Sequence, residues 1–239
     1  MTRVSVLKAT GMSKKFGGVT AVDNVDIEVG RSEAVGLIGP NGAGKTTLLN
    51  MLSGLIKPDR GHVELEGKSV DGLRPHQLMR KGLARTFQIP KLFKQMTVLE
   101  NVLVPLASTD MDGAAMHSKA AKLLKLVGLA GMENMLGSEL SGGQQKLLEI
   151  ARALTTEPKI VLMDEPLAGV HPQIKETILS TISDMKKGGV SFLIVSHDVK
   201  TITSISDRLV AMSSGKKIAD GVPTEVMLSA EVVESYLGV

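Results

Sequence analysis

The sequence has 239 residues, enough for one large α/β domain or for one domain with an inserted subdomain. Hydrophobic residues make up 43%, and the net charge of +3 is too small and too dispersed to support a DNA-binding surface. The chain has no cysteine, which excludes disulfides, thiolate zinc sites and cysteine nucleophiles, and its 2% aromatic content argues against base stacking with nucleic acid. We find no apolar run long enough to span a membrane and no signal peptide at the N-terminus, so we expect a soluble protein.

The first third of the chain predicts strands. Apolar residues at Val4 and Val6, and again at Val25, Ile27 and Val29, alternate with polar ones, as is typical of half-buried antiparallel strands. A nearly continuous apolar run at 33–39 (EAVGLIG) predicts a strand buried on both faces. A Gly-rich turn follows, then a helix over Lys45–Ser53, and residues 62–67 alternate again.

The middle third has a helical pattern. Thr97 and Glu100 have capping-box spacing, which predicts a helix through about Val104. Met116–Val127 has helical periodicity, and Ser141–Leu154 again starts with capping-box spacing. Residues 90–155 therefore read as an all-helical insert.

The last third alternates strands and helices. Residues 160–164 (IVLMD) and 190–195 (VSFLIV) predict buried strands. Between them, Pro172 is suited to the first position of a helix that Gly188 ends. Two more strands and a short helical segment complete the chain. This order predicts an α/β fold with parallel strands joined by right-handed crossovers.

A phosphate-binding motif follows the first buried strand. Its glycines let backbone N–H groups turn toward phosphates, and the helix that follows directs its positive end at them. Lys45 brings a positive charge to the β- and γ-phosphates, and the Thr46 hydroxyl can ligate Mg²⁺. The motif G-x-x-x-x-G-K-[ST] consists of Gly39, Pro40, Asn41, Gly42, Ala43, Gly44, Lys45 and Thr46.

Two carboxylates end the buried strand at 160–164. Burying charged groups at the end of such a strand costs free energy unless they bind a partner. Asp164 can support Mg²⁺, directly or through water, and Glu165 can polarise an attacking water. Without the phosphate-binding motif upstream, the same pair would only indicate a strand end that leaves the core.

Residues 140–144 read LSGGQ, and at this point the sequence resembles the ATP-binding cassette (ABC) ATPases, whose signature is this pentapeptide. The resemblance implies a P-loop NTPase core of the RecA-like type with an antiparallel β subdomain and an inserted helical subdomain. Residues 1–89 and 156–239 would form the core and β subdomain, and 90–155 the helical signature subdomain. The cofactors implied are ATP and Mg²⁺. In this family the signature (Ser141, Gly142, Gly143 and Gln144 here) binds the ATP held by the partner of a head-to-tail dimer.

Further motifs of the family appear in order. Phe16 matches the aromatic residue that stacks on adenine, Gln88 the residue that touches Mg²⁺ and water, and His197 the histidine that contacts the γ-phosphate. Thr47 joins the implied ATP-binding residues, and Lys45, Glu165 and His197 are the implied catalytic set, with Thr46, Gln88 and Asp164 at the metal. One position departs from the pattern, because His171 stands where most members carry an Asp that couples the two sites. His171 is also placed to cap the helix that begins at Pro172.

The stretch 82–105, together with FGGVTAVDNV and GVPTEVMLSAEVVESYLGV, is similar to ATPase subunits of branched-chain amino acid importers. The implied partners are a second ABC ATPase, identical or homologous, transmembrane permease subunits and, indirectly, a solute-binding protein. The implied location is peripheral, on the cytoplasmic face of the cell membrane. No nucleic acid partner is expected, since DNA-repair relatives need a long coiled coil between the Gln88 and Ser141 motifs.

Alternatives remain open at this point. Importers of urea or other small polar solutes have similar ATPase subunits, and the ATPase itself does not touch the solute. A soluble ABC ATPase without a transport role would have the same motifs but no membrane partner. A silent ATP-binding subunit is disfavoured because Glu165 and His197 are both present.

Overall fold

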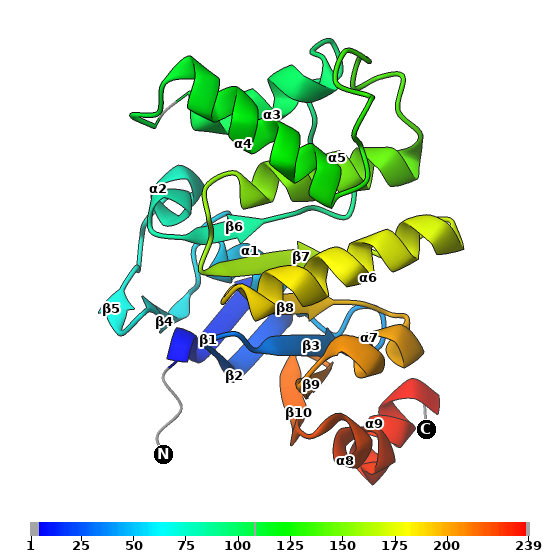
Figure 1. Cartoon of the computed structure of the whole chain (residues 1–239). Coiled ribbons are helices and arrows are strands. Elements are labelled where there is room, and N and C mark those ends of the chain that lie inside the picture. Colours follow the sequence, from blue (N-terminus) through cyan, green and yellow to red (C-terminus); the bar gives the residue numbers. More distant parts are fainter. Residues whose placement is uncertain (1–4, 108, 238–239) are drawn as a thin grey trace.

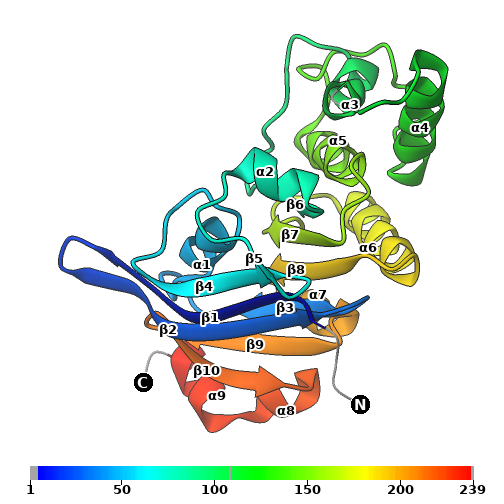
Figure 2. The same cartoon turned by 90° about the vertical axis from the view of Figure 1, so that its left-hand side faces the viewer.

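The computed structural model describes residues 5–107 and 109–237; Val4, in the first predicted strand, lies outside them. The described chain builds two sheets with helices around them (Figure 1, Figure 2). The first is antiparallel, in the order β2-β1-β4-β5. Its strands are β1 (Ser5–Phe16), β2 (Val19–Gly30), β4 (Arg60–Leu65) and β5 (Lys68–Ser69). Val25, Ile27 and Val29 are buried, as their alternation predicts.

The second sheet has the order β10-β9-β3-β8-β7-β6. The strands β9, β3, β8, β7 and β6 pair with one another in parallel, and β10 pairs antiparallel with β9 at the edge of the sheet. Every residue of β3, β7 and β8 is buried, which explains their unbroken apolar runs. The α/β prediction is thereby confirmed. The strands are β3 (Ala34–Ile38), β6 (Leu83–Arg85), β7 (Ile160–Asp164), β8 (Ser191–Val195), β9 (Arg208–Ser213) and β10 (Lys216–Gly221).

The helices lie on both faces of this sheet and at its two ends. In Figure 1, α3, α4 and α5 stack together at one end, and α8 and α9 lie at the other. Among the described residues, no helix combines the length and the apolar character that crossing a membrane requires. The helices are α1 (Lys45–Leu52), α2 (Pro75–Arg80), α3 (Val98–Leu106), α4 (Gly113–Leu126), α5 (Gly142–Leu154), α6 (Pro172–Lys187), α7 (Val199–Ile205), α8 (Pro223–Leu228) and α9 (Ala230–Leu237).

Helix ends follow their capping chemistry. The capping boxes predicted at Thr97 and Ser141 are both present. The α4 helix begins earlier than its periodicity indicates, because the Asp112 side chain accepts a hydrogen bond from the Ala115 N–H at 2.7 Å. The α3 helix runs two residues beyond Val104, with Pro105 inside its last turn.

Two buried clusters, one on each face of the parallel sheet, form the core. Val35 and Leu37 of β3 face a cluster shared with α1 and the antiparallel sheet. Ala34 and Ile38 face the other cluster, which continues through α5 to α3 and α4. Because successive side chains of β3 point into different clusters, the sheet is packed between two apolar layers. The apolar face of α5 belongs to the second of these clusters.

Candidate functional site

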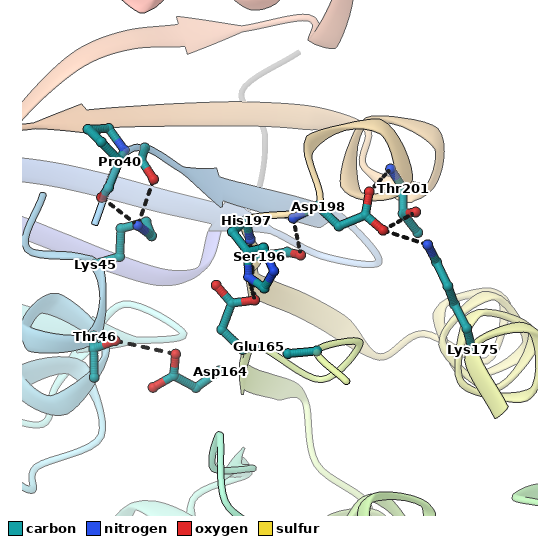
Figure 3. Close-up of polar contacts among 12 residues, drawn as sticks. Pro40, Lys45, Thr46, Asp164, Glu165, Lys175, Ser196, His197, Asp198 and Thr201 are labelled. Atoms are coloured by element: carbon teal, nitrogen blue, oxygen red, sulfur yellow. Dashed lines mark hydrogen bonds and ion pairs between the residues drawn. The ribbon is translucent and has the colours of Figure 1, made fainter. Parts of the chain in front are cut away.

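The carboxyl ends of the parallel strands meet at one edge of the sheet, and the polar residues that follow them gather there (Figure 3). β8 lies between β3 and β7 and pairs with both. The loop after β3, the Asp164-Glu165 pair after β7 and His197 after β8 are therefore neighbours. Ligands of open α/β sheets bind at this edge.

The loop 39–46 is a tight backbone cradle leading into α1. At Gly39 (φ 146°) a Cβ atom would lie 2.1 Å from the carbonyl oxygen of Met212, and at Gly44 (φ 98°) one would lie 2.3 Å from that of Ala21. Only glycine fits these two positions. The chain can therefore turn its N–H groups toward the open side of the loop, at the positive end of α1.

Lys45 folds back over this loop. Its Nζ donates to the carbonyl oxygens of Gly39 at 2.7 Å and Pro40 at 2.9 Å (Figure 3). Burial lowers the pKa of Lys45, and the charges of Glu165 and Asp164 oppose that shift. The ammonium group is thus held within the cradle by weak carbonyl partners, which phosphate oxygens can replace with charge-assisted bonds.

Asp164 is buried between a hydroxyl and a guanidinium group. Its Oδ1 lies 3.4 Å from Thr46 Oγ1, and its Oδ2 lies 3.4 Å from the NH2 group of Arg85. Burial raises the pKa of Asp164, while Arg85, Thr46 and Lys45 act in the opposite direction. Arg85 also donates to the Ser53 hydroxyl at 2.6 Å, which fixes its guanidinium plane.

Glu165 is joined to His197 across the ends of β7 and β8. The Glu165 Oε2 atom lies 2.8 Å from His197 Nδ1 and accepts from the His197 N–H at 3.2 Å (Figure 3). Glu165 adopts a left-handed backbone (φ 50°), which is strained for a side chain of this kind. Lys146 of α5 stabilises that turn by donating to the carbonyl oxygens of Glu165 at 3.0 Å and Ala168 at 2.6 Å.

A second ion pair fastens the segment after His197. Asp198 caps α7 by accepting from the Thr201 N–H at 3.1 Å, and it pairs with Lys175 of α6 (Figure 3). These bonds lower the pKa of Asp198 to about 2, with the Lys175 bond the largest cause. No motif in the sequence indicated this link between α6 and the His197 segment.

Other predicted site residues lie away from this cluster. Phe16 is half-exposed at the end of β1, where it pairs with Val19 at the start of β2. Gln88 is exposed in the loop after β6. Ser141 caps the exposed start of α5, and within the described chain no contact joins it to Lys45. His171 Nδ1 accepts from the Gln173 N–H at 3.4 Å, so its predicted capping role is confirmed.

The donors at this edge suit a small hard cation. Thr46 and Asp164 present a hydroxyl and a carboxylate oxygen within 3.4 Å of each other beside the phosphate-binding loop. Mg²⁺ prefers oxygen ligands and commonly takes only a few from the protein, with phosphate and water oxygens completing its shell. These residues fit that requirement, whereas the exposed position of Gln88 leaves its predicted contact with the metal a proposal.

Comparisons with known proteins agree with this geometry. The family model described as ABC transporter matches residues 22–168. The chain belongs to the ABC transporter family. It is 38% identical to the high-affinity branched-chain amino acid transport ATP-binding protein BraF of Pseudomonas aeruginosa, over 98% of each chain. It is 39% identical to the probable branched-chain amino acid transport ATP-binding protein LivG of Archaeoglobus fulgidus, over 98% of this chain and 96% of that one.

Solved ABC structures are also similar to this chain. An ATP-binding cassette of an ABC transporter in its ADP conformation superposes with a TM-score of 0.88 at 36% identity, over 98% of this chain and 99% of that one. A dimeric bacterial ABC transporter cassette superposes with a TM-score of 0.83 at 28% identity, over 91% and 98%. The predicted cassette fold is confirmed, and nucleotide binding is a property of such cassettes.

Several residues that shape the site were not predicted from the sequence. Arg85 pairs with Asp164, Lys146 holds the turn after β7, and Glu149 accepts from the loop that carries Gln88. Each is a charged residue with at least one apolar residue directly beside it in the sequence, which is a signal that the residue has a buried partner. The sequence could not name that partner, because each contact depends on the order of the strands.

Proposed function

We propose that this chain is the ATP-binding and ATP-hydrolysing subunit of an importer for branched-chain amino acids. The observation that carries the proposal is the gathering of Lys45, Asp164, Glu165 and His197 at one sheet edge in a chain similar to BraF and LivG over nearly its whole length. The substrate assignment rests on these relatives, which are branched-chain amino acid transport ATP-binding proteins.

ATP binds with its phosphates in the loop 39–46, and its adenine stacks on Phe16. Lys45 exchanges its two carbonyl partners for phosphate oxygens, and Thr47 adds a hydroxyl at the start of α1. Thr46 and Asp164 would hold Mg²⁺, with Gln88 as a further ligand, and the metal would supply positive charge that offsets the charge of the phosphates. Residues 1–89 and 156–239 form this core, and 90–155 form the helical subdomain.

Hydrolysis relies on Glu165 and His197. The Glu165 carboxylate orients and polarises the attacking water, and the contact with His197 Nδ1 holds that carboxylate at the edge of the site. His197 and Lys45 offset charge that develops on the γ-phosphate, and this positioning accounts for most of the acceleration.

Two copies of the cassette, identical or homologous, complete each site. The Ser-capped start of α5 has N–H groups and a positive dipole end that suit a γ-phosphate, and its first two residues are exposed. The residues of this signature are Ser141, Gly142, Gly143 and Gln144. The dimeric cassette among the similar structures supports this arrangement. ATP binding closes the pair and hydrolysis reopens it, a population shift between two states.

Transmembrane permease subunits dock where the Gln88 loop meets α2 and α5, which places the chain on the cytoplasmic face of the membrane. A cavity of about 280 Å³ lies there, lined by residues of α2, β6 and α5. Leu55 in this lining is 47% exposed, and Ile89, between the lining residues Phe87 and Lys91, is 73% exposed. More than one apolar side chain is therefore available to a partner. A solute-binding protein acts through the permeases.

The proposal is tested by purifying this chain from detergent-solubilised membranes of its native cells and identifying the proteins that accompany it. Recovery of hydrophobic permeases and a second ATPase, followed by ATP-dependent leucine uptake into vesicles rebuilt from them, is the expected result. Recovery of soluble partners only would rule out the importer, and uptake of urea but not leucine would rule out the substrate.

A further inference from the structure

Glu149 of α5 binds the backbone of the loop that carries Gln88. Its Oε2 atom accepts from the Phe87 N–H at 3.2 Å, and its Oε1 atom accepts from the Lys91 N–H at 3.0 Å. One turn further along α5, Arg152 donates to the carbonyl oxygen of the same Lys91. Because these bonds reach backbone groups on both sides of Gln88, the loop is held whatever its side chains are.

At Thr86 and Phe87 the hydrogen-bond partner of the backbone changes from the strand β7 to the helix α5. The Thr86 N–H donates to the Leu162 carbonyl oxygen at 2.9 Å, which is the last bond to the strand β7. The next N–H, that of Phe87, donates to the Glu149 carboxylate instead. Gln88 therefore lies immediately after the residue at which the backbone stops bonding to the sheet and starts bonding to α5.

The surroundings of Glu149 stabilise its carboxylate in this contact. Its side chain is buried, with Lys146 and Arg152 on its own helix and Arg85 on β6 as the nearby cations. Arg152 also lies over the Phe93 ring, 4.9 Å from its centroid. A buried carboxylate is retained only where hydrogen bonds and cations satisfy it, and here both of its oxygens are used by the loop.

We propose that Glu149 is a positioning residue for ATP hydrolysis, which holds the Gln88 loop on α5 so that the loop moves with the Ser141 end of that helix. The inference deepens the proposed function and rests on it, because it gives the Gln88 loop a part in turnover. The loop and the start of α5 then respond together when a nucleotide binds at either one.

The test compares Glu149→Ala and Glu149→Gln with the wild-type chain and with Glu157→Gln as control, since the Glu157 side chain is 80% exposed. Backbone hydrogen exchange and steady-state ATP hydrolysis are measured on the full-length protein. With Glu149→Ala we expect exchange at Phe87 and Lys91 to become about tenfold faster, because each amide loses its acceptor.

In the same variant, we expect kcat to fall about tenfold while the KM for ATP stays within about twofold, since the phosphate-binding loop is untouched. Glu149→Gln keeps one acceptor oxygen and should lie between Ala and wild type. Glu157→Gln should match the wild type in both measurements.

Unchanged exchange at both amides in Glu149→Ala would overturn the inference, and so would faster exchange with unchanged kcat. A raised KM with faster exchange throughout the chain would indicate a merely structural role and would also overturn it. Absence of hydrolysis by the wild-type chain would instead overturn the proposed function, and the exchange rates would still decide whether Glu149 holds the loop.

Discussion

Replacing Arg85 by Met tests how Asp164 is kept ionised inside the protein. The two side chains are 7% and 4% exposed, and the guanidinium group lies 3.4 Å from the carboxylate. Removing one partner of a buried ion pair leaves an uncompensated charge, at a cost of about 3–5 kcal/mol. Because Thr46 and Lys45 also act on Asp164, we expect the lower end, about 3 kcal/mol of unfolding free energy at about pH 8.

This loss of stability should shrink as the pH falls. Burial raises the pKa of Asp164 and Arg85 opposes that shift, so removing Arg85 raises the pKa further. The folded variant then keeps a proton on Asp164 over a pH range in which the unfolded chain has lost it, and its stability decreases as pH rises through that range. At about pH 5 we expect a smaller loss than at about pH 8, while the hydrogen bond to Ser53, which contributes about 1 kcal/mol, is lost at both pH values.

Urea unfolding without nucleotide, near each of these pH values, measures both losses. Arg31→Met is the matched control, because the Arg31 side chain is 61% exposed and its pair with Glu66 is a surface pair. Such pairs contribute at most about 1 kcal/mol. An Arg85→Met loss that is the same at both pH values, or no larger than that of Arg31→Met, would refute the assigned role of this ion pair.

Three further substitutions test the site itself. Glu165→Gln should keep ATP binding, lower kcat by about 10²-fold or more and trap a closed dimer. Normal turnover, together with a gel-filtration profile that shows no dimer, would contradict the role of Glu165. Lys45→Ala should abolish ATP binding in a fluorescent-nucleotide titration, and unchanged affinity would count against the phosphate-binding loop. His171→Ala should cost about 1 kcal/mol in thermal unfolding through loss of the α6 cap, and no loss would show that the 3.4 Å contact with the Gln173 N–H contributes nothing.

Local chemistry explains the parts of the fold that were predicted correctly. The strands β3, β7 and β8 are continuous apolar runs because both of their faces are buried, and α5 begins where Ser141 and Gln144 cap each other. The short helix α2 was not predicted, although Pro75 stands at its first position. Its few residues bury only Leu78, too little to produce a periodic pattern.

The contacts within the site could not be predicted from the sequence in the same way. The motifs named Lys45, Asp164 and His197 but not the strand order that brings them together, which places β8 between β3 and β7. The pairing of Arg85 with Asp164 likewise requires β6 to lie beside β7. Nothing local to either residue encodes that neighbour, since it arises from long-range packing.

The helix α5 links these contacts to the proposed cycle. Its Lys146 holds the carbonyl oxygens of the turn that contains Glu165, and Glu149 and Arg152 hold the loop after β6. The three side chains recur at three-residue intervals and so lie along one side of the helix. Its apolar residues pack into the core cluster that reaches the sheet, which makes the helix a stiff element. A displacement of α5 on nucleotide binding would therefore change the position of the Glu165 carboxylate and of the Gln88 loop at the same time. This common support explains how one helix can link the phosphate binding proposed at Ser141 to the surface where the permeases are proposed to dock.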